Sequence, residues 1–235
     1  MSEGSRVESL SDWYVTEQLD FDKRLIRFRY ETLRPHLQGT EGLELGPAEG
    51  EMTQFLINDF QRLTVVDGAG ELLARIPNRP NLHKVHSLFE DFEPGHQFDT
   101  IILEHVLEHV HEPVRLLAKV RGWLKPNGRL LAGVPNGNSF HRLAAVKMGL
   151  LPNGCSLNSR DLALGHRRVY VPESFRADLG AAGFVVVEMG GVFFKPLSNR
   201  QIQDNWTDEM IRGFYELGKE FPENAAELYA VASLQ

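Results

Sequence analysis

The sequence predicts an α/β fold in which a mostly parallel sheet carries helices on both faces. Short apolar segments alternate with amphipathic ones along most of the chain, which is the rhythm of strands joined by crossover helices. The first apolar segment also runs directly into a turn that contains Gly46 and Gly50. With 235 residues, 42% of them hydrophobic, the chain can fill one core, so residues 1–235 are expected to form a single domain.

The first five expected strands are short and apolar, and helices are expected between them. The strands are GLEL (42–45), RLTVVD (62–67), LHKVHSL (82–88), FDTIILEH (98–105) and RLLAGVPN (129–136). The helices cover residues 49–60, 68–76 and 106–124, the last one stopped by the turn KPNG at 125–128.

The flanks of this core differ from it in pattern. Residues 13–37 place apolar side chains between charges, as amphipathic helices do, and residues 1–39 are expected to form an amino-terminal helical cap. Residues 137–166 mix Gly, Pro, Asn and Ser with apolar residues and are expected to be a partly helical insertion that covers the site. Beyond them we expect helices over 171–184 and 205–221 and strands over 184–191 and 227–234, with one late strand antiparallel.

The composition limits the classes of partner and the compartment that we expect for this chain. The net charge of −7 opposes binding to a phosphate backbone, so no nucleic-acid partner is expected. Cys155 is the one cysteine, which excludes an intrachain disulfide. No apolar run approaches the ~20 residues that cross a bilayer, and the first residues lack the apolar core of a signal peptide. A cytoplasmic protein without a membrane partner, monomeric or homodimeric, is the expectation.

The turn after the first strand, ELGPAEG, places Glu44 just ahead of its glycines. Gly46 and Gly50 would let backbone N–H groups approach a ligand at the start of a helix. A dinucleotide fingerprint needs glycines where Ala48 and Glu51 stand, and no Gly-Lys-Ser/Thr of a phosphate-binding loop follows. A carboxylate at this place suits a cationic ligand, and Asp67 at the end of the next strand suits ribose hydroxyls.

These blocks resemble the class I S-adenosylmethionine-dependent methyltransferases from about residue 40 to the end. ELGPAEG is similar to their first motif, VVD to their second, and FDTIILEHVLEHVHEP with LKPNGRLLAGVPN to the fourth-strand and fifth-strand blocks. The resemblance implies a Rossmann-like sheet of seven strands with one antiparallel, and S-adenosylmethionine as cofactor. It implies that the cofactor is bound by Glu44, Gly46, Pro47, Ala48, Gly50, Asp67, Gly68, Ser87, Leu88, Phe89 and Glu104. Leu88 stands where many members have an acid, so the backbone near Phe89 is expected to border the adenine.

Histidines concentrate where the fourth strand ends. His105 is expected beside the reacting methyl group, where it could act as a general base, and His166 is the second candidate for that role. The alternative is that His105 only packs against its neighbours or orients other groups, without taking a proton. HVLEHV is also similar to a segment of the ubiquinone-pathway O-methyltransferases, some of which need a metal ion. His105, Glu108 and His109 could share one helical side, but a brace for the helix start is favoured over a metal site.

Basic side chains gather on both sides of the insertion and indicate an acceptor that is polar, with an anionic group as one option. Salt bridges that brace the insertion explain them equally well. The residues expected on the acceptor side are His109, His141, Arg142, Arg168, Tyr170 and Tyr14.

The function expected from the resemblance is methyl transfer to an oxygen of a small polar metabolite. Transfer to the nitrogen of a small amine or amino sugar is the alternative within the same class. Two alternatives of other classes remain at this point: a non-catalytic module that binds a nucleoside, and a nicotinamide-dependent reductase.

Overall fold

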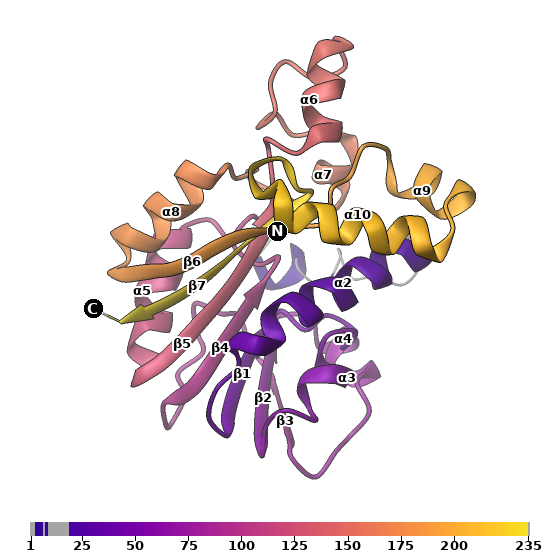
Figure 1. Cartoon of the computed structure of the whole chain (residues 1–235). Helices are drawn as coiled ribbons and strands as arrows, with labels where there is room; N and C mark the ends of the chain where they lie inside the picture. Colours follow the sequence, from indigo (N-terminus) through magenta and orange to yellow (C-terminus); the bar gives the residue numbers. More distant parts are fainter. Residues whose placement is uncertain (1–2, 7, 9–18, 235) are drawn as a thin grey trace.

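The computed structural model describes residues 3–6, 8 and 19–234 of the chain, and its centre is one seven-stranded sheet (Figure 1). The strand order is β3-β2-β1-β4-β5-β7-β6; β7 runs antiparallel to both of its neighbours, and the pairings among β1 to β5 are parallel. The predicted fold class, a Rossmann-like and mostly parallel sheet, is therefore confirmed. The strands are β1 (Glu41–Leu45), β2 (Arg62–Asp67), β3 (Leu82–His86), β4 (Phe98–Glu104), β5 (Leu124–Pro135), β6 (Phe184–Val192) and β7 (Glu227–Leu234).

Helices cover both faces of the sheet. α5 and α8 pack on one face, where Leu117 and Phe175 are completely buried against the central strands. α2 crosses the other face, so that Leu33 meets Leu131 and Val231, while α10 lies beside α2 (Figure 1). The helices are α2 (Asp20–Leu33), α3 (Thr53–Leu56), α4 (Gly70–Arg75), α5 (Pro113–Trp123), α6 (Phe140–Lys147), α7 (Ser159–Ala163), α8 (Pro172–Ala181), α9 (Asn199–Asn205) and α10 (Asp208–Glu220), with 3₁₀ turns η1 (Arg34–His36) and η2 (Pro222–Asn224).

Three predicted boundaries were wrong, two of them at the end of the sheet that bears the site. The helix expected over 106–124 begins only at Pro113, because His105 takes a left-handed backbone with φ +56° and the chain turns until proline fits the first helical position. The expected turn KPNG lies inside β5, where a shift of register against β4 absorbs the extra residues. The helix expected over 49–60 is reduced to α3, between turns.

The segments predicted to flank the core are partly helical. α2 and η1 fall within residues 13–37, and α6 and α7 lie in residues 137–166, with α6 standing away from the sheet in Figure 1. The late strand expected over 227–234 is β7, with those bounds. Within the described residues, none of the helices has the length and apolarity needed to cross a membrane.

Two glycines of α10 test how tightly this helix packs. A Cβ at Gly218 would lie 2.4 Å from the backbone nitrogen of Phe193, whereas a Cβ at Gly213 meets nothing within 4 Å. We expect Gly218→Ala to lower the free energy of unfolding by about 1–3 kcal/mol through overpacking. The matched Gly213→Ala should raise it by about 0.5–1 kcal/mol, because alanine is the better helix former. Urea unfolding of both variants measures this, and equal effects at the two positions would contradict the packing described.

Candidate functional site

The turn after β1 is built on left-handed backbone. Gly46, Ala48 and Gly50 have φ of +73°, +48° and +88°. A Cβ at Gly46 would lie 2.9 Å from Cγ2 of Val106, so glycine is required there by both conformation and space. Ala48 adopts the same region at some strain. The turn therefore brings its backbone close to the segment that follows β4.

A first cavity, here the glycine-turn cavity, opens between this turn and the ends of β2 and β4. Its volume is about 120 Å³, and Asp67 lies at one side of it. Burial raises the pKa of Asp67, although its oxygens accept hydrogen bonds from the backbone nitrogens of Ala69 at 2.9 Å and Ala48 at 3.1 Å. Of the residues predicted to hold the cofactor, those that line this cavity are Gly46, Ala48, Asp67, Gly68, Leu88 and Phe89.

The other predicted cofactor residues lie deeper or to the side. A smaller cavity next to the turn, here the Glu44 cavity, is lined by Glu44, Pro47 and Glu104 as well as Arg29. Gly50 and Ser87 line neither cavity: Gly50 shapes the turn, and the hydroxyl of Ser87 donates to the carbonyl oxygen of Leu88 at 2.9 Å.

The Glu44 cavity holds two buried acids with elevated pKa values. Burial raises the pKa of Glu44 to about 7, and the charges of Asp67 and Glu104 add to this although Thr53 donates to its carboxylate at 2.7 Å. Burial likewise raises the pKa of Glu104 to about 7, against the opposing charge of Arg29 at 3.9 Å. Both acids therefore favour a further positive charge in this cavity.

His105 is held between two other carboxylates. Its Nδ1 lies 3.2 Å from Glu108 and its Nε2 lies 3.4 Å from Glu227. Burial and the nearby charge of Arg29 act to lower the pKa of His105, but the two carboxylates outweigh them and raise it to about 9. His105 is therefore an imidazolium at neutral pH with no lone pair to offer, which argues against the general-base role predicted for it.

A second cavity of about 210 Å³, here the insertion cavity, lies under residues 137–166, and most of the residues that line it are charged or polar. Of the residues predicted on the acceptor side, His109, His141 and Arg142 line it, and so does His166. His105 and His109 line the glycine-turn cavity as well, so the two cavities meet at these histidines. Tyr14 lies outside the described residues.

Three of the basic or polar residues predicted to contact the acceptor are engaged in structural hydrogen bonds. The guanidinium of Arg142 bonds Asp161 at 3.0 Å and the carbonyl oxygens of Gly154 and Ser156, which ties the insertion together. Arg168 donates to the carbonyl oxygens of Leu107 and His111, and Tyr170 donates to Asp178 at 2.9 Å. Neither Arg168 nor Tyr170 lines a cavity described above, because their side chains are used to brace the turns around α5 and α8.

His166 faces an acid and a second histidine. Its Nδ1 lies 3.4 Å from Asp161, and its ring meets that of His109 edge to face with centroids 4.8 Å apart. Burial tends to raise the pKa of Asp161, but His166, the backbone of Asn158 and Arg142 outweigh this and lower it to about 2. His109 is a neutral ring, since burial, against the attraction of Glu108, lowers its pKa to about 4.

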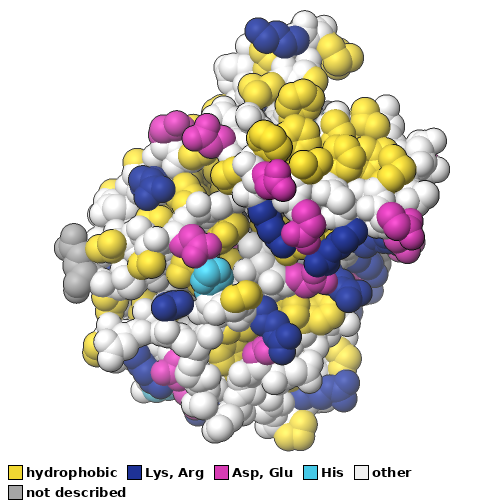
Figure 2. All heavy atoms as spheres, in the orientation of Figure 1, with side chains coloured by type: hydrophobic (Ala, Val, Ile, Leu, Met, Phe, Trp, Pro, Cys, Tyr) yellow, Lys and Arg dark blue, Asp and Glu magenta, His cyan; other side chains and the backbone are white. Residues whose placement is uncertain are grey.

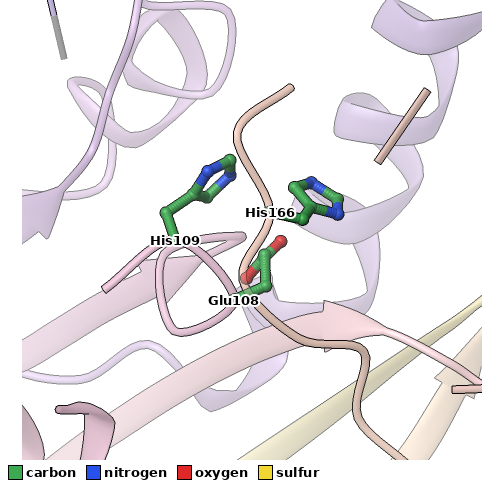
Figure 3. A group of neighbouring side chains, drawn as sticks. All are labelled: Glu108, His109 and His166. Atoms are coloured by element: carbon green, nitrogen blue, oxygen red, sulfur yellow. The ribbon is translucent and has the colours of Figure 1, made fainter. Parts of the chain in front are cut away.

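The set of side chains that could hold a metal ion differs from the one considered from sequence. Glu108, His109 and His166 place one ligand atom each within 4.8 Å of one another, and Figure 3 shows their side chains converging. His105 is not part of this group, because the segment is a turn rather than a helix and its Nδ1 contacts Glu108. The expectation of no metal ion stays a prediction.

Comparison with known proteins identifies the family. Residues 16–189 match a family described as a methyltransferase domain. The chain belongs to this family. A ubiquinone biosynthesis O-methyltransferase of Xanthomonas euvesicatoria is 26% identical to this methyltransferase over 186 residues, covering 74% of the chain and 75% of the relative.

Solved structures agree on the fold of the methyltransferase. One is a 1,6-didemethyltoxoflavin-N1-methyltransferase of Burkholderia thailandensis with bound S-adenosylhomocysteine, with a TM-score of 0.65 at 16% identity, covering 99% of this chain and 88% of the other. Another is the N-methyltransferase NodS of Bradyrhizobium japonicum with the same ligand, with a TM-score of 0.59 at 17% identity and 96% of each chain covered. The family match, together with these structures, confirms the predicted enzyme class and S-adenosylmethionine dependence.

Four residues of this methyltransferase that matter to the site were missed from its sequence. Arg29 lies in α2 and Glu227 is the first residue of β7, while Lys195 lies between β6 and α9 and Asn199 is the first residue of α9. No local motif marks them, because each reaches the site from a distant part of the chain. The signal available for Glu227 was a charged residue at the start of a strand that is otherwise apolar.

Proposed function

We propose that the protein transfers the methyl group of S-adenosylmethionine to a hydroxyl oxygen of a small polar acceptor. The observation that carries this is the meeting of two cavities at His105 and His109. One cavity lies at the glycine turn and suits the cofactor, and the other lies under the insertion and suits the acceptor. Bound in the first cavity, S-adenosylmethionine supplies an electrophilic methyl group on a positively charged sulfur. The chain positions the acceptor and excludes water.

The residues present fit the cofactor in charge and shape. Asp67 borders the glycine-turn cavity and retains lone pairs for ribose hydroxyls, while Leu88 and Phe89 offer apolar and backbone contacts to the adenine. In the Glu44 cavity, Glu44 and Glu104 suit the ammonium of the methionyl group. Arg29, whose buried Nε has no hydrogen-bond partner among the described residues, suits its carboxylate.

His166 is the proposed general base. The carboxylate of Asp161 faces Nδ1 and favours the tautomer that leaves the lone pair on Nε2. That nitrogen can take the proton that the acceptor hydroxyl loses as its oxygen forms the new bond to carbon. His109, next to it and neutral, can orient the hydroxyl.

Oxygen is favoured over nitrogen by the charges of the insertion cavity. Arg29, Arg142 and Lys195 line it, and its carboxylates already face cations, so an ammonium acceptor gains little there. The matched curated relative is named an O-methyltransferase, whereas the two solved structures are named N-methyltransferases. The polar lining also favours a small hydrophilic acceptor over a strongly apolar one.

The assignment of Asp67 is tested by binding. Asp67→Ala should weaken the binding of S-adenosylhomocysteine by at least about 30-fold, because charge-assisted hydrogen bonds to the ribose are lost. Asp204→Ala, on an exposed part of α9, is the control and should change nothing. Isothermal titration measures both, with thermal unfolding as the check that the turn at Ala48 survives. Unchanged affinity in Asp67→Ala would refute the ribose assignment.

The two elevated carboxyl pKa values predict a pH dependence of cofactor binding. Glu44 and Glu104 have pKa values of about 7, so below that pH each must lose a proton before it can face an ammonium. Affinity for S-adenosylhomocysteine should therefore fall from pH 8 to pH 6, by up to about tenfold per pH unit for each group displaced. Titrations in buffers of different ionisation enthalpy should show proton release, and Glu44→Gln should flatten the profile. An affinity that is constant from pH 6 to pH 8 would contradict the placement of the methionyl ammonium beside Glu44 and Glu104.

The base is tested by turnover. Transfer of labelled methyl groups is measured to a panel of phenols, sugars and hydroxy acids. His166→Gln should lower kcat by about 10²- to 10⁴-fold while S-adenosylhomocysteine binds as in the wild type. His83→Gln, an exposed histidine on β3, is the matched control. A His166→Gln enzyme with wild-type kcat would refute His166 as the general base. Turnover on matched amines alone would show that the acceptor atom is nitrogen and not oxygen.

A further inference from the structure

The carboxylates that line the insertion cavity are already matched by guanidinium groups. Asp22 accepts a hydrogen bond from Nη2 of Arg160 at 3.0 Å, and Asp161 accepts one from Nη1 of Arg142 at the same distance. The third is Glu227, which lies 3.4 Å from Nε of Arg29 and also faces His105. Each acid of this lining therefore has its own cation.

Lys195 is the cation of the lining that has no such partner. Its Nζ donates to the side-chain oxygen of Asn199 at 2.8 Å, and within the described part of the chain no carboxylate oxygen lies within 4.0 Å of it. Burial lowers the pKa of Lys195 to about 8, with Arg160 and Arg142 adding to this and Glu227 and Asp22 opposing it. An ammonium with one acceptor has two further N–H groups to offer.

Asn199 fixes the position of this ammonium. The amide nitrogen of Asn199 donates to Asp22, so its oxygen is directed to Lys195. Asn199 is buried and belongs to the first turn of α9. The lysine is thus oriented by a neutral group, which holds its position without cancelling its charge.

His141 lies beside Lys195 and adds a neutral donor. The backbone nitrogen of His141 donates to the carbonyl oxygen of Lys195 at 3.1 Å, and both side chains line the insertion cavity. Burial, with the charges of Lys195 and Arg142, lowers the pKa of His141 to about 2, so the ring is neutral. Its Nδ1 is buried and has no hydrogen-bond partner among the described residues.

We propose that Lys195, assisted by His141, binds a carboxylate of the acceptor, so that the acceptor is a small hydroxy acid. This rests on the proposed function, in which the hydroxyl lies at His166 and the methyl group arrives past His105 and His109. One ammonium without a carboxylate partner matches one negative charge, which favours a carboxylate over a doubly charged phosphate. Lys195 is then a residue that determines specificity, while His166 takes the proton.

Binding to the protein saturated with S-adenosylhomocysteine tests this without turnover. The probes are 3,4-dihydroxybenzoate, 4-hydroxybenzoate, glycerate and glucuronate, each paired with its carboxamide, and 4-hydroxyphenyl phosphate. At least one acid should bind at least about tenfold more tightly than its amide, as expected when a charge-assisted contact is lost. The Lys195→Met variant should bind that acid about tenfold or more weakly than the wild type and its amide less than about twofold more weakly. The Lys195→Arg variant should retain most of the affinity for the acid.

The control is Lys147→Met, which removes an exposed lysine of α6 and should leave all affinities unchanged. Equal binding of every acid and its amide, or an acid affinity that Lys195→Met does not reduce, overturns the inference. Tighter binding of the phosphate than of any acid would mean that the site prefers a doubly charged group to a carboxylate, and this also overturns the inference. Failure to bind S-adenosylhomocysteine in the same titrations would refute the proposed function itself, which keeps the two outcomes apart.

Discussion

The interaction on which the site depends is the pairing of one imidazole with two buried carboxylates. His105 faces Glu108 on one ring nitrogen and Glu227 on the other, at 3.2 and 3.4 Å. Carboxylates removed from water carry a large penalty unless a cation lies beside them, and removal of the cation would leave that penalty uncompensated. The contacts join the turn after β4 to the start of β7, and thereby fix the floor where the two cavities meet. The left-handed backbone of His105, φ +56°, is the local strain that this arrangement sustains.

The chemistry of each cavity follows from the charge that its own lining leaves unmatched. In the Glu44 cavity the acids Glu44, Glu49, Glu51 and Glu104 outnumber the cations Arg29 and His105. Burial, with smaller contributions from neighbouring acids, raises the pKa of Glu44 and Glu104. In the insertion cavity the acids are matched and Lys195 remains. A cationic group is therefore favoured on one side of His105 and an anionic group on the other. This difference in sign suits a sulfonium donor with an ammonium group and an acceptor of opposite charge.

The sheet was predictable from sequence because strands such as RLTVVD and ELYAVASL are mostly apolar between charged or polar ends, which is typical of strands buried on both faces. The turn at Gly46 and the acid at Asp67 were predictable because they are local to strand ends. The start of α5 was not, since His105 is left-handed and contacts Glu227, a partner far along the chain. Arg142 and Arg168 illustrate the same limit: a basic side chain looks alike in sequence whether it meets a ligand or a carbonyl oxygen. Lys195 and Arg29 carry no motif, so only the folded chain distinguishes them from other cations.

Arg29 links the two halves of the site. Its Nε lies 3.9 Å from Glu104 on the cofactor side and 3.4 Å from Glu227 on the acceptor side. A methionyl ammonium beside Glu104 would favour the ionised form of that acid and so strengthen its hold on Arg29. A methionyl carboxylate would compete with both acids for the same guanidinium. Because Glu227 also faces His105, any shift of Arg29 alters the field at the point where the methyl group would pass. In the proposed arrangement Arg29 therefore couples the charges of the cofactor side to those of the acceptor side.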